Sequence, residues 1–169
     1  MLKSVTFSLA LFCASAQVSS AQDWAFYYGP DFEASAKESY AHLNAGPNYL
    51  QVHAYGERGT IALSTTIDAF ETGNKVPERL QTNPTITFNV IGPVPRYSRD
   101  IRPDQYVWEH RDDQNNTLIV FLLTRDDMAA LIDSDAVFVN FDGLQFRFGS
   151  NGADTALRQL VNTLIEAYN

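Results

Sequence analysis

The chain has 169 residues and a formal net charge of −8, with 12 Lys+Arg against 20 Asp+Glu; 45% of its residues are hydrophobic and 19% are charged. These values are typical of a folded globular protein, and the length predicts a single domain. The acidic balance argues against a nucleic-acid binder and against an electrostatic membrane-surface binder, because both need clustered positive charge.

Residues 1–21 have the features of a secretory signal. Lys3 supplies positive charge, and a short apolar run over residues 5–14 is followed by small residues. That run is too short to span a bilayer. Two small-x-small sites fit cleavage, and we expect the one that ends at Ala21. The prediction is therefore a signal peptide over 1–21 and one β-rich domain over 22–169, periplasmic or secreted.

Cys13, the only cysteine, lies inside this predicted signal. The mature protein is then expected to have no disulfide and no cysteine ligand for a metal. Loss of Lys3 changes the net charge to 11 − 20 = −9. No later stretch is long and apolar enough to cross a membrane, so the fold must depend on its core, which a chain of about 150 residues can supply.

The rest of the chain is patterned mainly as strands. We predict strands at 24–28, 49–55, 60–65, 85–91, 105–110, 117–123, 136–141 and 144–148. The last two form a hairpin around Asp142-Gly143, a pair that favours a two-residue turn and places Phe141 opposite Leu144. The strand at 117–123 is apolar on both sides, which is typical of a central strand covered on both faces.

A second hairpin joins 49–55 to 60–65. A four-residue loop at 56–59 would place Ala54 opposite Ile61 and Val52 opposite Leu63, giving one apolar face.

Two helices are predicted in the second half of the chain. Thr124 and the aspartates that follow it form a capping pattern, so a short helix should run to Ile132. A terminal helix over 154–168 carries one apolar stripe, made of Leu157, Leu160, Val161, Leu164, Ile165 and Tyr168. The predicted fold is mainly β (α+β): an antiparallel β-sandwich or strongly twisted sheet of about seven or eight strands, with this amphipathic helix on one sheet face.

This order of elements resembles small exported bacterial β-sandwich proteins of the invasion-associated locus B type and of the periplasmic type VI secretion-associated type. The stretches that carry the resemblance are 49–52, 59–63, a strand at Trp108, a strand and short helix, then 136–139, 146–149 and 156–160. The resemblance implies a periplasmic accessory or envelope protein without established catalytic residues. The cysteines that such proteins carry after the first core strand and at the C-terminus are absent here.

Signatures of catalysis are missing from the sequence. It contains no Gly-x-Ser-x-Gly elbow, His-Glu-x-x-His, phosphate-binding glycine loop or EF-hand. The three histidines are His42, His53 and His110, and their spacing does not predict a metal site, so we expect no metal and no cofactor. A Ser–His–Asp arrangement stays open, because triads are defined by geometry and not by spacing.

The segment 92–103 is unusual because it is rich in proline and arginine. We predict a long loop with three arginines and one aspartate, a local charge of 3 − 1 = +2. Arginine donates two hydrogen bonds at once to anions, so Arg96, Tyr97, Arg99 and Arg102 form one candidate site for an anionic ligand or a partner. The alternative, which we favour, is a solvated connection whose arginines pair with nearby acids.

A second candidate is one face of the strand at 49–55. Tyr49, Gln51, His53 and Tyr55 point to the same side, where aromatic and hydrogen-bonding groups suit sugars or a protein partner. The alternative, again favoured, is that these tyrosines pack beneath the terminal helix or the segment 29–47.

These observations predict an exported, non-catalytic envelope accessory or binding protein whose partner is another envelope protein or an anionic ligand. The alternative class is a secreted hydrolase with an unrecognised site around His110 or His53 and carboxylates. A third interpretation is a structural subunit of an assembly.

Overall fold

The computed structural model describes residues 23–29, 38–45, 48–55, 60–68, 75–93 and 96–169. The predicted signal peptide at 1–21 and the predicted turn at 56–59 lie outside these residues.

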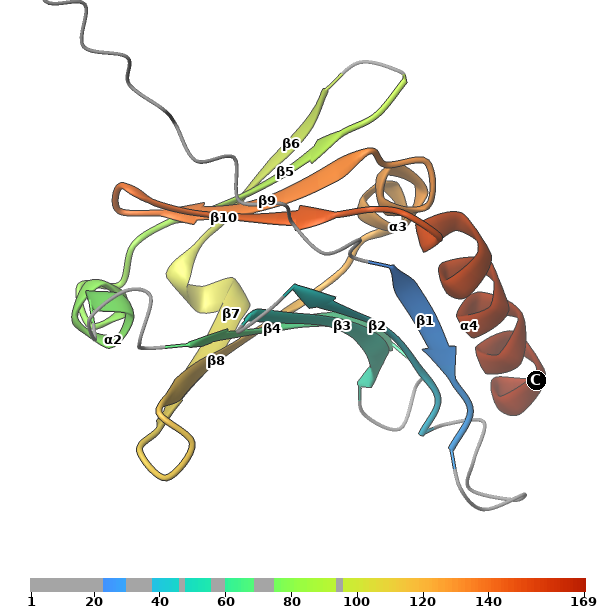
Figure 1. The fold of residues 1–169 in the computed structure, drawn as a ribbon, viewed down its shortest axis with the longest axis horizontal. Helices are drawn as coiled ribbons and strands as arrows, with labels where there is room; N and C mark the ends of the chain where they lie inside the picture. The colour runs from blue at the N-terminus through green and yellow to red at the C-terminus, as the bar shows by residue number, and fades with distance from the viewer. Residues whose placement is uncertain (1–22, 30–37, 46–47, 56–59, 69–74, 94–95) are drawn as a thin grey trace, which may run out of the picture.

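Two antiparallel sheets form the framework (Figure 1). The six-stranded sheet contains, in spatial order, β1 (Trp24–Tyr27), β2 (Tyr40–Ala45), β3 (Asn48–Tyr55), β4 (Thr60–Asp68), β8 (Asn116–Leu122) and β7 (Tyr106–Arg111). The four-stranded sheet contains β10 (Leu144–Gly149), β9 (Ala136–Phe141), β5 (Ile86–Ile91) and β6 (Tyr97–Ile101). The described residues thus hold ten strands, and the predicted mainly β, antiparallel class is confirmed.

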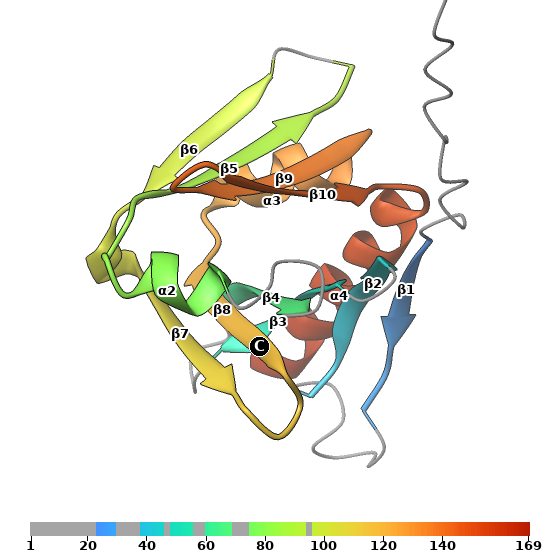
Figure 2. The ribbon, with the colours of Figure 1, turned by 60° about the vertical axis from the view of Figure 1, so that its left-hand side comes forward.

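Helical elements complete the sandwich. They are α2 (Lys75–Leu80), the 3-10 turn η1 (Pro103–Gln105), α3 (Arg125–Ile132) and α4 (Ala153–Tyr168). Helices α2 and α4 stand at opposite ends of the gap between the sheets (Figure 1). The turn η1 connects β6 of one sheet to β7 of the other along one side of the molecule (Figure 2).

Both predicted hairpins have the predicted register. Phe141 pairs with Leu144 in β9 and β10, and the turn residues Asp142 and Gly143 have φ angles of 44° and 79°. Both angles lie in the left-handed region that such a turn requires. In β3 and β4, Val52 pairs with Leu63.

The core lies between the sheets, where each strand contributes alternate residues. Phe88 of β5 and Phe121 of β8 meet across the sandwich with ring centroids 5.6 Å apart. On α4 the stripe residues Leu157, Leu160 and Leu164 are buried, as predicted. This helix therefore contributes to the same core as the sheets.

Ile165 is 53% exposed, so the predicted stripe is too wide at this position. It lies at the edge of the stripe, near the end of α4, where one side of the helix faces solvent.

The prediction that β8 is covered on both faces is also wrong, because Leu122 is 46% exposed. The inner face of β8 is buried, whereas its outer face is only partly covered.

The predicted loop over 92–103 is wrong over residues 97–101, which form β6 at the edge of the four-stranded sheet. The alternation is present, with Tyr97, Arg99 and Ile101 on the inner face and Ser98 and Asp100 outside. Arg99 in an inner position hides that pattern in the sequence, since it replaces an expected apolar residue. Strand β2 and helix α2 were not predicted either.

Candidate functional site

The outer face of the six-stranded sheet gathers most of the aromatic and polar residues singled out above. Strand pairing aligns its side chains in rows, three of which cross most of the sheet, while a shorter row at one end contains Asp68, Asn116 and Arg111. The first row consists of Tyr27, Tyr40, His53, Ala62 and Leu122. The second consists of Ala25, His42, Gln51, Ser64, Val120 and Val107. The third consists of Asn44, Tyr49, Thr66, Leu118 and Glu109. These rows, with Tyr55 and Thr60 beside them, are called the outer face below.

Aromatic rings follow one another across β1, β2 and β3 on this face. The ring centroids of Tyr27 and Tyr40 are 4.7 Å apart and stacked, those of Tyr40 and His42 are 5.4 Å apart, and those of His42 and Tyr49 are 5.7 Å apart and stacked. Such contacts stabilise neighbouring strands and fix the ring positions. The rings therefore form an ordered aromatic half of the outer face.

Burial among these rings shifts the pKa of two side chains, Tyr49 and His42. Burial raises the pKa of Tyr49 to about 12, and the nearby Tyr40 adds to the shift. Burial lowers the pKa of His42, whose Nδ1 is buried without a hydrogen-bond partner among the described residues. Both shifts favour the neutral side chain, so this half of the face stays uncharged over a wide pH range.

His53 is held by two hydrogen bonds. Its Nδ1 lies 2.9 Å from the carbonyl oxygen of Ala54, and its Nε2 lies 2.7 Å from Oγ of Ser64. A carbonyl only accepts, so Nδ1 donates to it, and in the neutral tautomer Nε2 accepts from the Ser64 hydroxyl. This is the geometry of a base beside a nucleophile.

A catalytic serine also needs an oxyanion hole, and the backbone around Ser64 does not form one. Strand β4 lies between β3 and β8, so its backbone N–H groups are used in the sheet ladder. A tetrahedral oxyanion needs free donors close to the attacked carbon. Ser64 is also 7% exposed, on an open sheet face. The pair can therefore fix the His53 ring without further chemistry.

The other half of the outer face, over β8 and β7, is aliphatic. Val107 is 60% exposed and Leu122 is 46% exposed, with Tyr55 at 49% on the adjoining end of β3. A shallow hollow lies here, and Val120, Tyr106 and, at its rim, the charged Asp104 also line it. Large apolar groups exposed together on one face are typical of a contact surface.

The predicted arginine segment is largely used inside the molecule. Arg99 contacts Asp127 at 2.5 Å and donates to the carbonyl of Leu122 at 2.9 Å. The Tyr97 hydroxyl donates to the other Asp127 oxygen at 2.8 Å. The buried carboxylate also accepts from the N–H and hydroxyl of Thr124, which completes the predicted cap of α3. These contacts join β6 to α3 and to the end of β8.

The remaining arginines are at the surface. Arg102 follows β6 and pairs with Asp104 at 3.2 Å, with both side chains well exposed. Arg96 is exposed just before β6 and has no ion pair with any described residue. The structure therefore separates the four residues of this predicted site, with Tyr97 and Arg99 directed inward.

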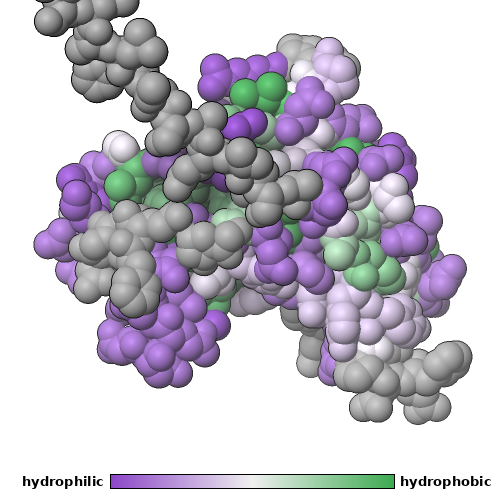
Figure 3. Space-filling view, in the orientation of Figure 1, coloured by the Kyte–Doolittle hydropathy of each residue, from purple (hydrophilic) through white to green (hydrophobic). Residues whose placement is uncertain are grey.

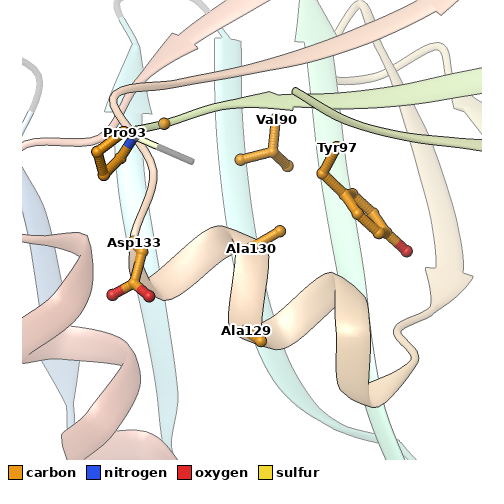
Figure 4. A pocket seen from close by; sticks show the side chains of 7 residues that line it. Val90, Pro93, Tyr97, Ala129, Ala130 and Asp133 are labelled. Carbon is orange, nitrogen blue, oxygen red and sulfur yellow. The ribbon is translucent and has the colours of Figure 1, made fainter. Parts of the chain in front are cut away.

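A hollow of about 280 Å³ lies beside α3, between that helix and the end of β5 (Figure 4). Val90, Tyr97 and Ala130 line it, with Asp133 at one side. Figure 4 shows the Tyr97 hydroxyl directed away from Asp133, so the two polar groups do not converge on one ligand atom. A few convergent polar groups are what a small-molecule site requires.

His110 lies at the far end of β7. Its Nδ1 is 3.0 Å from Oγ1 of buried Thr117, and its Nε2 is 3.2 Å from the exposed carboxylate of Asp112. Across the part of the chain that the structure describes, no three His, Cys, Asp or Glu residues gather closely enough to hold a metal ion.

A second apolar area lies over β1 and α4, where Figure 3 shows hydrophobic side chains among more polar ones. On α4, Ile165 is 53% exposed, and Val161 and Ile61 line a shallow hollow beside it. This area is narrower than the outer face and does not extend across several strands.

Sequence reasoning found Tyr49, Gln51, His53 and Tyr55 but missed the residues that the register adds to them. These are Tyr27, Tyr40, His42, Val107 and Leu122. A signal for two of them was present, because residues 40–45 alternate Tyr, His and Asn with Ala, Leu and Ala. The predicted covering of Tyr55 is wrong, since it is half exposed.

The architecture is that of a small antiparallel β-sandwich closed by a C-terminal helix. The sequence matches no family model and no curated protein. Its fold is similar to that of invasion associated protein b from Bartonella henselae, known from a crystal structure, with a TM-score of 0.52, 13% sequence identity, and coverage of 86% of this chain and 96% of that chain. The predicted resemblance to the invasion-associated locus B type is thus confirmed for the fold, which is all that 13% identity supports.

None of the helices in the described residues has the length and apolar character that crossing a bilayer requires.

Proposed function

We propose that this protein is an exported accessory protein of the cell envelope that acts by binding, and that the outer face is its contact surface. The observation that carries the proposal is the character of that face. Its three long rows contain one charged residue, Glu109, and the short row at one end adds Asp68 and Arg111, in a chain with a net charge of −8. Depletion of charge together with enrichment in tyrosine is typical of the centre of a protein interface.

Export rests on the predicted signal at residues 1–21. Fractionation of cells that express the full sequence should place the protein in the periplasm or the medium, with an N-terminus at Gln22. Cytosolic protein with the opening segment still attached would contradict this part of the proposal.

The contact surface can be tested by photo-cross-linking in those cells. A photoreactive residue in place of Tyr27, on the outer face, should give a discrete cross-linked product. The matched control is the same residue in place of Thr87, which lies on the outer side of the four-stranded sheet. Equal labelling at both positions, or none at Tyr27, would contradict the proposal.

The predicted residues Tyr49, His53 and Tyr55 belong to this proposed surface. An anionic ligand at the arginine segment would have to rely on Arg96, because Arg99 and Arg102 already pair with Asp127 and Asp104. Replacing Arg96 with Ala should therefore leave the Tyr27 cross-link unchanged.

The hydrolase alternative rests on the bond between His53 and Ser64. Its test is reaction with a fluorophosphonate, which labels activated serines. We expect no labelling, because the backbone N–H groups of β4 around Ser64 are used in the sheet ladder. Stoichiometric labelling that Ser64→Ala abolishes would favour the hydrolase.

A further inference from the structure

We propose that the partner of the outer face is a second copy of this chain, packed sheet against sheet about a two-fold axis. The axis runs parallel to the strands, over the line between β3 and β4, which is the centre of the six-stranded sheet. It places β1 of one copy over β7 of the other. This inference rests on the proposed function, since it assumes that the outer face is a contact surface.

Charge is the first argument. Two copies of a chain with a net charge of −8 repel one another, so they can associate only through a region that carries little charge. The three long rows of the outer face contain Glu109 alone, and Arg111 offsets it at 3.9 Å. The row beyond them adds Asp68 and Arg111, so the charged residues gather toward one end of the face and leave its centre without charge.

Shape is the second argument. The β1–β3 half carries the bulky rings of Tyr27, Tyr40 and Tyr49, whereas the β8–β7 half has a hollow beside Val107 and Leu122. A two-fold axis through the centre brings the aromatic half of each copy onto the hollow half of the other. A surface that is complementary to itself in this way is what an isologous dimer requires.

The size of the face is sufficient. Six strands spaced about 4.8 Å apart, with residues rising about 3.4 Å each from Tyr49 to Tyr55, give a plane of roughly 29 Å by 24 Å. That is about 700 Å² before side-chain relief is added, close to the roughly 800 Å² that each partner buries in a standard interface. A second copy therefore covers the face without needing any other contact.

The ring geometry favours a protein over a glycan. A sugar stacks on the open face of an aromatic ring, but Tyr27 and Tyr40 stack on each other, with 24° between their planes. His42 and Tyr49 do the same, at 25°. Each of these four rings thus has one face covered by its stacking partner, which reduces the ring area open to a sugar.

The first test is sedimentation of the protein purified from cells that express the full sequence. We expect a concentration-dependent dimer that persists in high salt, because no ion pair holds it. Leu122→Glu should weaken the dimer at least a hundredfold. The matched controls are Ile91→Glu and Ile165→Glu, which add the same charge at exposed isoleucines elsewhere and should leave the dimer intact.

The second test fixes the geometry. Cys13 is the only natural cysteine and lies in the predicted signal, so introduced cysteines report on their own positions. A protein with both Ala25→Cys and Val107→Cys should be joined between chains by a short bismaleimide cross-linker, because Ala25 and Val107 lie in the same row and β1 lies over β7. A direct disulfide is too short to connect sheets packed about 10 Å apart. Each single variant should not, since its own cysteines lie at opposite ends of the dimer.

A monomer at every concentration would overturn the dimer, as would equal weakening by all three glutamate variants. If the wild type is monomeric but the photoreactive residue at Tyr27 captures a different molecule, the dimer is wrong and the proposed function stands. If it captures nothing, both proposals fail.

Discussion

The two segments that carried the predicted binding residues occupy opposite sides of the same sandwich. In β6, Tyr97 and Arg99 point into the molecule and are bound to buried Asp127. In β3, Tyr49, His53 and Tyr55 point away from the core, on a face that no helix in the described residues covers as α4 covers the inner side.

The difference shows that composition alone does not identify a site. Three arginines with a tyrosine suggested a place for an anion, but the anion that Arg99 binds is a carboxylate of its own chain. Strand β3, with its tyrosines and histidine, contains no charged residue and no catalytic motif. It nevertheless lies where a partner can reach it, and neighbouring strands extend it.

Among the variants that test this comparison, Asp127→Ala should cause the largest loss of stability. The change removes the acceptor of Arg99, Tyr97 and Thr124 at once, and it leaves a guanidinium without its partner inside the sandwich. We expect the free energy of unfolding to fall by about 3–5 kcal/mol, measured by urea denaturation.

Its matched control is Asp126→Ala, one residue earlier in the same first turn but exposed. That variant should lose about 0.3–1 kcal/mol, the contribution of an acid near a helix N-terminus. Equal losses in the two variants would show that the buried network is not what joins β6 to α3.

Arg99→Ala should have the next largest effect. Asp127 keeps its bonds from Tyr97 and Thr124, so the loss in unfolding free energy should be about 2–3 kcal/mol, in the range of hydrogen bonds to charged groups. Arg102→Ala should change stability by less than about 1 kcal/mol, because its pair with Asp104 is exposed. The opposite order would contradict the inner placement of Arg99.

Tyr27→Ala should affect stability less and association more. Tyr27 is 41% exposed and contributes mainly its stack on Tyr40. We expect a loss of about 0.5–1 kcal/mol in chemical denaturation, typical of a cross-strand aromatic pair. Its self-association, followed by sedimentation, should weaken clearly, whereas Tyr27→Phe should retain both properties.

Alkaline titration should single out Tyr49. With its pKa raised to about 12 in the folded protein, its phenol stays protonated after exposed tyrosines have ionised near pH 10. The folded state holds this proton more tightly than the unfolded state, so the stabilisation is complete below pH 10 and is lost as the pH rises toward 12. Tyr49→Phe should remove the last step of the absorbance titration.

A smaller effect is expected at mildly acidic pH, from His42. Burial lowers its pKa, so the unfolded state takes up the proton first. The stability that neutral His42 provides is complete above pH 6.5 and declines as the pH falls below that value. An NMR titration of the ring should show the low pKa, and His42→Gln should reduce the dependence of stability on pH.

The sequence by itself determined the local elements and their pairing. Asp142-Gly143 and the alternation around it set the β9–β10 register, Thr124 and Asp127 set the start of α3, and the leucines of α4 predicted its buried side. These features follow from backbone geometry and from a period of two or 3.6 residues, both of which act over a few neighbours.

Only the tertiary structure decided what the polar segments do. Arg99 faces inward because β6 pairs with β5, and its partner Asp127 lies 28 residues away on α3. The outer face likewise combines residues from Ala25 to Leu122, aligned by five strand pairings that no local pattern specifies. Contacts between distant segments depend on how whole sheets assemble, so the sequence named part of the surface and the fold completed it.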